Sequence, residues 1–345
     1  FKLNNEGEVD RVAASLDILP AHMDLFLKKI EKELPKVYLY VGFRDLIKTL
    51  KDPAKQDSAL DITGFYRLCA FITRDTAMAH IVDGGQNDAV EFIMCLIDYL
   101  HDSHSMPGVV DIDPAVMALT DAEVDALPIN QRIRCGLLRT IHYNYKRSYT
   151  PLYNEVYFYM LNIVICQQCQ YHSLNYSPYN MLCLPLNKSS PGQTLYDTLD
   201  TLFCRETLDC EYKCEKCGNK TGNCIEKKLL TPPKTLMICL KRFDYKVIQG
   251  MGVPYKVDLK IMYPMILDVG KYHPSEAIEY NTYKLVAVIN HMGHLNYGHY
   301  YSYCYHEDLG SWFSYNDAHV AKMTEADVLN HSQHAYILFY ERIKS

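Results

Sequence analysis

The sequence lacks three features that would assign it at once to a broad class of protein. No apolar run approaches the roughly 20 residues that a membrane-spanning helix needs, and the longest, at 156–166, is interrupted by Asn162 and is typical of a strand. No segment resembles a signal peptide. The formal net charge is -6 and no basic patch is interleaved with aromatic residues. We therefore expect neither a membrane nor a nucleic acid as a partner.

The composition that is present is typical of a folded globular protein. Of the 345 residues, 48% are hydrophobic and 22% are charged, which is enough apolar material for a core without disulfides. The 13 cysteines are an odd number in a chain without a secretory signal, which favours metal binding over disulfides. We expect a cytoplasmic or nuclear protein. Because the first residue is Phe1 and not Met, we also expect a fragment or a processed form.

The order of the periodic segments predicts an α+β fold. Apolar residues at helical spacing predict helices at 20–34, 41–50, 61–73 and 86–101. Prolines break up 103–152 and leave short helices such as 120–127, so we interpret this segment as an insertion or a mobile connection. Beyond it, strands are predicted at 156–166, 225–230, 235–243, 283–290, 300–306 and 335–340, with short helices at 194–203 and 325–330.

Two Cys-x-x-Cys pairs predict a structural metal site. The four residues are Cys166, Cys169, Cys214 and Cys217. Four thiolates make a closed tetrahedral zinc site, which has no open position for water and therefore holds structure without doing chemistry. The separation of the pairs places them at the tips of two hairpins. Cys210 and Cys224 flank the second pair, so the ligand set stays open here, and unrelated buried cysteines are the alternative.

A histidine and an aspartate near the carboxy end form a candidate catalytic pair. The sequence around His299 alternates like a strand, and Gly298 would let the backbone of a ligand approach closely. A second strand-like run ends in Asn316-Asp317, so an antiparallel hairpin would bring the carboxylate beside the imidazole. Such a pair supplies the base and the orienting group of a catalytic triad. A packed histidine with structural hydrogen bonds is the alternative on spacing alone.

Taken in order, these segments resemble the ubiquitin-specific protease family of deubiquitinases. Residues 86–92 (QNDAVEF) are similar to the glutamine-aspartate helix of the family, and the cysteine pairs occupy the places of its finger ribbon. The other matches are at 233–243 (its proline-to-LKRF strand), 256–268 (the strand that follows), 298–300 and 312–320 (its histidine box) and 335–340 (its closing strand). The matches run in family order over most of the chain.

The resemblance implies a papain-like cysteine protease with a hand-like fold. Its parts would be a helical thumb (1–102), the insertion (103–152), fingers with a zinc ribbon (153–235) and a palm with the histidine box (236–345). The implied reaction is hydrolysis of the isopeptide bond after the Gly-Gly tail of ubiquitin or a ubiquitin-like modifier. His299 would be the base, with Asn316 and Asp317 beside it. The implied ubiquitin-binding residues are Gln86, Asp88, Glu91, His294 and Gly298.

One family feature, the nucleophile in an amino-terminal Asn-x-Cys box, is not found. The first cysteine is Cys69, which lies on an apolar helical stretch, and Cys95 lies on another. Thiols on such faces are inert. Three explanations stay open: the box precedes Phe1, the nucleophile has been replaced, or the protein is a pseudoenzyme. We therefore predict a deubiquitinase whose nucleophile lies outside this sequence, with a catalytically inactive ubiquitin-binding scaffold as the alternative.

Overall fold

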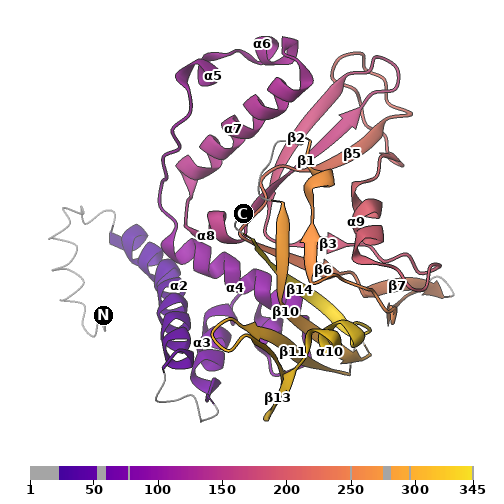
Figure 1. Ribbon diagram of the computed structural model, residues 1–345. Coiled ribbons are helices and arrows are strands. Elements are labelled where there is room, and N and C mark those ends of the chain that lie inside the picture. Colours follow the sequence, from indigo (N-terminus) through magenta and orange to yellow (C-terminus); the bar gives the residue numbers. More distant parts are fainter. Residues whose placement is uncertain are drawn as a thin grey trace. The chain divides into compact units, whose positions relative to one another are not determined.

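The computed structural model describes residues 23–52, 60–76, 78–248, 251–274, 281–294 and 297–343 (Figure 1). These residues divide between two units, Phe1–Ser105 and Met106–Ser345. Helices make up the first unit and most strands of the second lie in two sheets, which confirms the predicted α+β class. Within the described ranges, no helix combines the length and apolar character needed to cross a membrane.

The first unit packs its helices around a small apolar core. Its elements are α2 (Met23–Leu50), α3 (Thr63–Thr73), η3 (Ala79–Val82) and α4 (Ala89–His104). The core consists of Leu39, Cys69, Ile72, Ile81, Val82 and Cys95. The predictions of α3 and α4 are confirmed, but the helices expected at 20–34 and 41–50 are one helix. Pro35 removes a single backbone hydrogen bond, and the helix continues on both sides of it.

The segment 103–152, expected to be an insertion or a mobile connection with short helices, contains one long, packed helix; whether it is an insertion stays a prediction. Its helices are α5 (Pro114–Ala118), α6 (Asp121–Ala126), α7 (Ile129–Arg147) and α8 (Leu152–Glu155). Ile133, Leu137 and Ile141 lie four residues apart on α7 and pack in one cluster with Leu161 and Ile163. The flanking prolines had suggested only short helices, whereas this apolar stripe sustains 19 residues.

The fingers sheet is antiparallel, in the order β2-β1-β5-β4. Its strands are β1 (Phe158–Ile165), β2 (His172–Tyr179), β4 (Glu206–Thr207) and β5 (Cys224–Leu229). Strand β1 pairs with β2 up to Ile165 opposite His172, and β4 pairs with β5 at Thr207 opposite Cys224. Residues 166–171 and 208–223 therefore form the tips of two hairpins, as the spacing of the cysteine pairs predicted.

The palm sheet runs β13-β12-β11-β10-β14-β6-β3, with β9 also pairing with β10. Its strands are β3 (Leu182–Leu184), β6 (Thr235–Leu240), β9 (Ile266–Asp268), β10 (Thr282–Gly293), β11 (Gly298–His306), β12 (Ser311–Asn316), β13 (His319–Met323) and β14 (Ala335–Arg342). Helices α9 (Leu195–Phe203) and α10 (Glu325–Asn330), both predicted, contribute to its core, as does the short η4 (Gly270–Tyr272). The sheet fixes the strand ends that carry the candidate catalytic residues.

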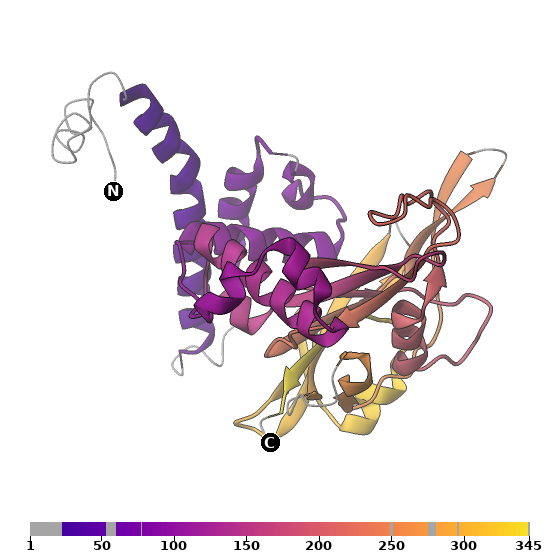
Figure 2. The same ribbon diagram turned by 90° about the horizontal axis from the view of Figure 1, so that it is seen from above.

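One predicted strand, 235–243, is in fact two. It ends at Leu240, and β7 (Phe243–Ile248) begins a separate hairpin with β8 (Met251–Lys256) that extends from the rest of the second unit (Figure 2). The break lies at Arg242, which is fully buried and donates from Nη1 to the carbonyls of Val257 (3.0 Å) and Leu259 (2.8 Å). Burying a guanidinium costs free energy unless its donors are hydrogen-bonded, and here backbone carbonyls accept from two of its three nitrogens: Nη1 binds outside the sheet and Nε binds Ala335 of β14.

Candidate active site and metal centre

The palm sheet brings His299, Asn316 and Asp317 together at one end of three strands. His299 is the second residue of β11, Asn316 ends β12, and Asp317 begins the turn to β13. The Nε2 atom of His299 lies 2.6 Å from Oδ1 of Asn316 and 3.8 Å from Oδ2 of Asp317. The expected hairpin therefore places both residues beside the imidazole. Their catalytic role stays a prediction.

The contact with Asn316 determines which ring nitrogen of His299 can act as a base. An amide oxygen only accepts hydrogen bonds, so Nε2 carries the proton and donates to it. The neutral ring then keeps its lone pair on Nδ1, which can take a proton from a thiol. Asp317 is close enough to stabilise the imidazolium that would form. The histidine side chain is 37% exposed, so a substrate can reach it.

The backbone at Asp317 is left-handed, with φ of 51°. It is the first central residue of the two-residue turn between Asn316 and His319, a position where glycine is usual in hairpins. Any residue with a Cβ at such a position costs some backbone strain, although Asp and Asn tolerate it better than other residues. Strain of this kind clusters at functional sites, which agrees with a role for the carboxylate beside His299.

Two of the predicted ubiquitin-binding residues, His294 and Gly298, lie at the hairpin between β10 and β11. The N–H of His294 donates to the carbonyl of Tyr297 (2.7 Å), and Gly298 pairs with Gly293. A Cβ at Gly298 would overlap Nε2 of His291. The physical reason for glycine is therefore an internal close approach, where the sequence had suggested the approach of a ligand. Contact with ubiquitin remains a prediction for both residues.

The other three predicted ubiquitin-binding residues belong to the first unit. Oδ1 of Asp88 caps helix α4 by accepting from the N–H of Val90 (2.7 Å). Oε2 of Glu91 lies 3.1 Å from Nε2 of His80, and Gln86 is exposed just before the helix. The cap accounts for one carboxylate oxygen of Asp88. Their contact with ubiquitin stays a prediction.

The cysteines in the core of the first unit are not suited to nucleophilic attack. Burial raises the pKa of Cys69 and of Cys95 to about 11, which leaves almost no thiolate at neutral pH. This agrees with their expected inertness. Cys304 lies on the same strand as His299, and burial raises its pKa as well. Over the described part of the chain, no cysteine sulfur is hydrogen-bonded to His299.

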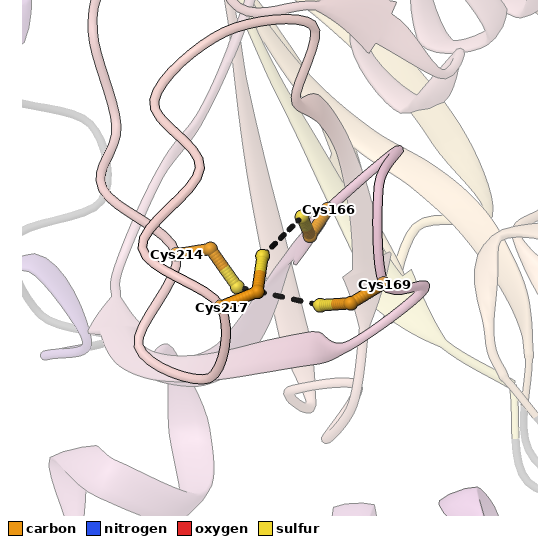
Figure 3. Close-up of side chains that lie close together, drawn as sticks. All are labelled: Cys166, Cys169, Cys214 and Cys217. Carbon is orange, nitrogen blue, oxygen red and sulfur yellow. Dashed lines mark hydrogen bonds between the residues drawn. The ribbon is translucent and has the colours of Figure 1, made fainter.

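The four cysteines of the two pairs form a compact sulfur cluster at the tips of the finger hairpins (Figure 3). Their Sγ atoms all lie within 4.8 Å of one another, with 3.6 Å between Cys166 and Cys217 and the same between Cys169 and Cys214. A tetrahedral site with Zn–S bonds of about 2.3 Å has S–S edges of roughly 3.8 Å. The spacing of the sulfur atoms therefore fits a tetrahedral metal ion.

The two pairs share one backbone geometry. The residue after the second cysteine of each pair is left-handed, with φ of 56° at Gln170 and 74° at Gly218. Its N–H donates to the carbonyl of the first cysteine, at 2.9 Å in both pairs. Hydrogen bonds from the N–H of Cys169 lower the pKa of the Cys166 thiol to about 6. The first turn thus supports a thiolate at Cys166, and the flanking Cys210 and Cys224 stand outside the cluster.

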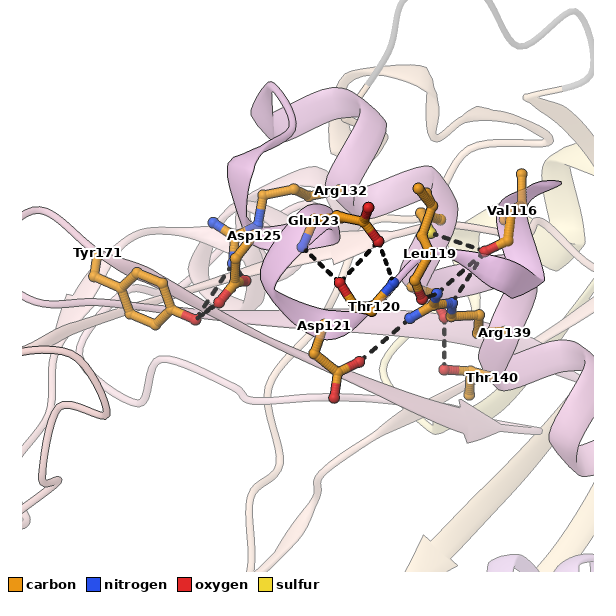
Figure 4. Close-up of polar contacts among 12 residues, drawn as sticks. Val116, Leu119, Thr120, Asp121, Glu123, Asp125, Arg132, Arg139, Thr140 and Tyr171 are labelled. Carbon is orange, nitrogen blue, oxygen red and sulfur yellow. Dashed lines mark hydrogen bonds and ion pairs between the residues drawn. The ribbon is translucent and has the colours of Figure 1, made fainter.

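A polar contact that sequence reasoning missed joins Asp125 of helix α6 to Tyr171, which follows the first cysteine pair (Figure 4 shows Asp125 and Tyr171). The hydroxyl of Tyr171 donates to Oδ2 of Asp125 (3.1 Å), and Nη2 of Arg132 donates to Oδ1 of Asp125 (2.7 Å). The carbonyl of Tyr171 accepts from the N–H of Cys166 (3.0 Å). Asp125 and Tyr171 are 46 residues apart, and no spacing pattern could have indicated their contact.

The chain is similar to solved structures in its fold and to curated proteins in its sequence. The chain is similar to the structure titled "Structure of the SAGA Ubp8/Sgf11/Sus1/Sgf73 DUB module bound to ubiquitin aldehyde", with a TM-score of 0.57 and 23% identity over 82% of this chain and 54% of that one. This likeness supports the hand-like α+β fold. The chain is 31% identical over 262 residues to "Ubiquitin carboxyl-terminal hydrolase 2" of Gallus gallus, covering 74% of this chain and 68% of that protein.

A viral protein and a family model give the same assignment. The chain is 39% identical over 167 residues to "Probable ubiquitin carboxyl-terminal hydrolase R319" of Acanthamoeba polyphaga mimivirus, covering 47% of this chain and 34% of that protein. The chain thus spans from about a third to two thirds of the length of these two relatives. The model described as "Ubiquitin carboxyl-terminal hydrolase" matches residues 10–340. The chain belongs to the ubiquitin carboxyl-terminal hydrolase family, in its ubiquitin-specific protease branch.

Proposed function

We propose that this chain is the ubiquitin-gripping and base-carrying part of a deubiquitinase. Its reaction is hydrolysis of the isopeptide bond after the carboxy-terminal Gly-Gly of ubiquitin or a ubiquitin-like modifier. The observation that supports this most is the contact of His299 with Asn316 and Asp317 at the end of the palm strands. Membership of the family supplies the substrate class.

The geometry of His299 suits the proton transfers of this reaction. Nδ1 takes the proton of the attacking thiol, whose sulfur forms a thioester with the Gly-Gly carbonyl, and then gives that proton to the departing lysine amine. Asn316 keeps the ring oriented through Nε2, and Asp317 stabilises the imidazolium. Water then attacks the thioester by the same route. The attacking thiol is not one of the buried cysteines of the first unit.

The metal cluster has a structural role in this proposal, with zinc as the ion. Cys166, Cys169, Cys214 and Cys217 supply four sulfur ligands and leave no open position for a substrate or water. The ion would hold the tips of the two finger hairpins together, so that the fingers keep the shape needed to grip a globular partner. The proposed partner is ubiquitin, with Gln86, Asp88, Glu91, His294 and Gly298 among its contacts.

A non-catalytic ubiquitin-binding scaffold is the second candidate. The observation in its favour is that, across the described residues, no cysteine is hydrogen-bonded to His299. A scaffold needs the fingers and the palm surface but no nucleophile. It predicts ubiquitin affinity without cleavage.

A ubiquitin probe with a thiol-reactive carboxy terminus tests the proposal in the natural protein that contains this chain. We expect covalent labelling of the wild-type protein and slower labelling of His299→Ala, with unchanged affinity for unmodified ubiquitin. His306→Ala is the matched control, because His306 is exposed at the other end of the same strand. Binding of ubiquitin without labelling would favour the scaffold, and no binding would overturn both candidates.

A further inference from the structure

Lys256 is a buried lysine directed at the strand opposite His299. It is the last residue of β8, outside the palm sheet, and its side chain is 2% exposed. Its Nζ donates to the carbonyls of His291 (2.8 Å) and Gly293 (3.1 Å), and it lies 3.1 Å from Oδ1 of Asp258. All three ammonium protons thus have an acceptor within hydrogen-bond distance.

The two carbonyls that Lys256 binds lie on β10 beyond the last residue that pairs with β14. Strand β14 pairs with β10 only as far as Ala335 opposite Asn290, and the N–H of His291 still points to that side, toward the carbonyl of His334. Beyond this point β10 has no ladder partner on the β14 side among the described residues. Lys256 takes the place of the missing strand by supplying donors to the carbonyls of residues 291 and 293.

These carbonyls belong to the residues on either side of Met292, and Met292 is the residue paired with His299 across β10 and β11. The position of the His299 backbone is therefore fixed by a strand segment that Lys256 holds in turn. Gly298, immediately before His299, is fixed separately because the buried ring of His291 packs against its Cα. The backbone of His299 is therefore positioned by two contacts: its pairing with Met292 on β10, and the packing of the neighbouring Gly298 against His291.

Burying an ammonium group costs desolvation free energy that an apolar side chain would not cost. Asp258, its ion-pair partner, is half exposed, so Lys256 bears most of the desolvation itself. A methionine of similar length would fill the volume without that cost but could not donate to the two carbonyls. The charged donors of Lys256 are thus needed for their hydrogen bonds to the hairpin that carries His299.

We infer that Lys256 is a positioning residue for His299, acting through the carbonyls of His291 and Gly293. This inference rests on the proposed function, since only a catalytic histidine needs such placement. Lys256 does not touch the reacting atoms, so its loss should lower the rate of chemistry far more than it weakens ubiquitin binding, to which His294 and Gly298 of the same hairpin contribute only two of the proposed contacts. A misplacement of about 1 Å in a catalytic group costs on the order of 100-fold in rate.

Three variants of the natural protein separate positioning from simple loss of structure. Lys256→Met removes the charge at constant length, Lys256→Arg keeps the charge and the donors, and Lys260→Met changes an exposed lysine four residues further along. The fraction of each variant that the ubiquitin probe labels at completion gives the concentration of correctly folded, competent molecules, by which the maximal rate is divided to give kcat. We expect kcat per competent molecule of Lys256→Met to fall about 10- to 100-fold, with KM within about twofold of wild type. Lys256→Arg should restore most of the loss.

Hydrogen exchange provides a second readout that does not depend on activity. The His294 amide, which donates to the Tyr297 carbonyl, should exchange faster in Lys256→Met and at the wild-type rate in Lys260→Met. A wild-type kcat per competent molecule in Lys256→Met would overturn the inference. If the wild-type protein itself shows no turnover, the proposed function fails. In that case faster exchange still supports the hold of Lys256 on the hairpin, and unchanged exchange overturns it.

Discussion

The candidate metal centre of the fingers and the candidate histidine site of the palm are built in opposite ways. Each cysteine pair is a local turn with the same backbone hydrogen bond, and the two turns need only meet. The site at His299 is assembled from the ends of three strands and depends on a lysine from outside the sheet. The cysteine cluster is thus encoded by two short local turns, whereas the site at His299 depends on how strands far apart in the sequence pair with one another.

The largest expected effect is loss of the metal, which would break the fingers and leave the palm core formed. Cys166→Ser removes one of four ligands, and structural zinc sites contribute on the order of 10 kcal/mol of apparent binding free energy. We expect less than one zinc per chain by elemental analysis and a clearly lower melting temperature. Cys210→Ser, which changes a cysteine outside the cluster, should keep the metal. Full zinc occupancy in Cys166→Ser would refute the assignment of the ligands.

Acid should weaken the palm through His291. Burial, with a contribution from Lys256, lowers the pKa of His291 from 6.5 to about 4. Between these two pH values the unfolded chain binds a proton at His291 and the folded chain does not. The full contribution of His291 to the free energy of unfolding is therefore present above pH 6.5. It is lost as the pH falls from 6.5 toward 4, by on the order of 2–3 kcal/mol. Lys256, His334 and Arg242 add to this effect and Asp258 opposes it.

The denaturation midpoint measured from pH 7 to pH 4.5 tests this acid sensitivity. The wild-type chain should lose stability across that range, and His291→Asn should lose less, because it has no group to protonate there. The test is best followed by NMR signals of palm residues, since acid also protonates the thiolates of the fingers. An equal loss in both proteins would contradict the role of His291.

The next effect distinguishes the two partners of the candidate base. Asn316 makes the short contact with Nε2 of His299, at 2.6 Å, and Asp317 lies farther away at 3.8 Å. We expect Asn316→Ala to lower kcat/KM by about tenfold or more, because the ring loses its orienting acceptor. Asp317→Asn should cost less. Steady-state kinetics on a ubiquitin substrate decide the order, and a larger loss in Asp317→Asn would reverse the assigned roles.

The smallest effect compares the same backbone strain in the two regions. Gln170 in the fingers and Asp317 in the palm are both left-handed, with φ of 56° and 51°. Gln170→Gly and Asp317→Gly should each stabilise the chain by up to about 1 kcal/mol in urea unfolding. The gain in the fingers should leave turnover unchanged, whereas the gain in the palm should be accompanied by a loss of turnover. Equal turnover in both variants would show that the strain at Asp317 has no function.

The sequence predicted what depends on short spacing. The cluster of four cysteines follows from two Cys-x-x-Cys pairs of equal spacing, and the contact of His299 with Asp317 follows from a strand, a turn and a second strand. Apart from 235–243, which is two strands, the predicted strands also match in position, because alternation in a half-buried sheet is a local pattern. Helix α7 was missed because flanking prolines masked an apolar stripe of only three residues, Ile133, Leu137 and Ile141.

The roles of Arg242 and Lys256 could not be predicted, since both are charged residues that the fold buries. In the sequence each resembles a surface residue, and the pattern of the family marks their positions without a role. Their acceptors are backbone carbonyls, such as that of Ala335, which lies 93 residues from Arg242. Backbone carbonyls have no sequence signature, so contacts of this kind become visible only in three dimensions.

The most direct test of the account is the turnover of an isopeptide-linked ubiquitin conjugate by the natural protein that contains this chain. We predict multiple turnovers by wild type and by His306→Ala. His299→Ala should be slower by about 100- to 10,000-fold, the range that a general base contributes. Its affinity for ubiquitin should stay the same. Wild-type turnover by His299→Ala would contradict the assignment of His299 as the base.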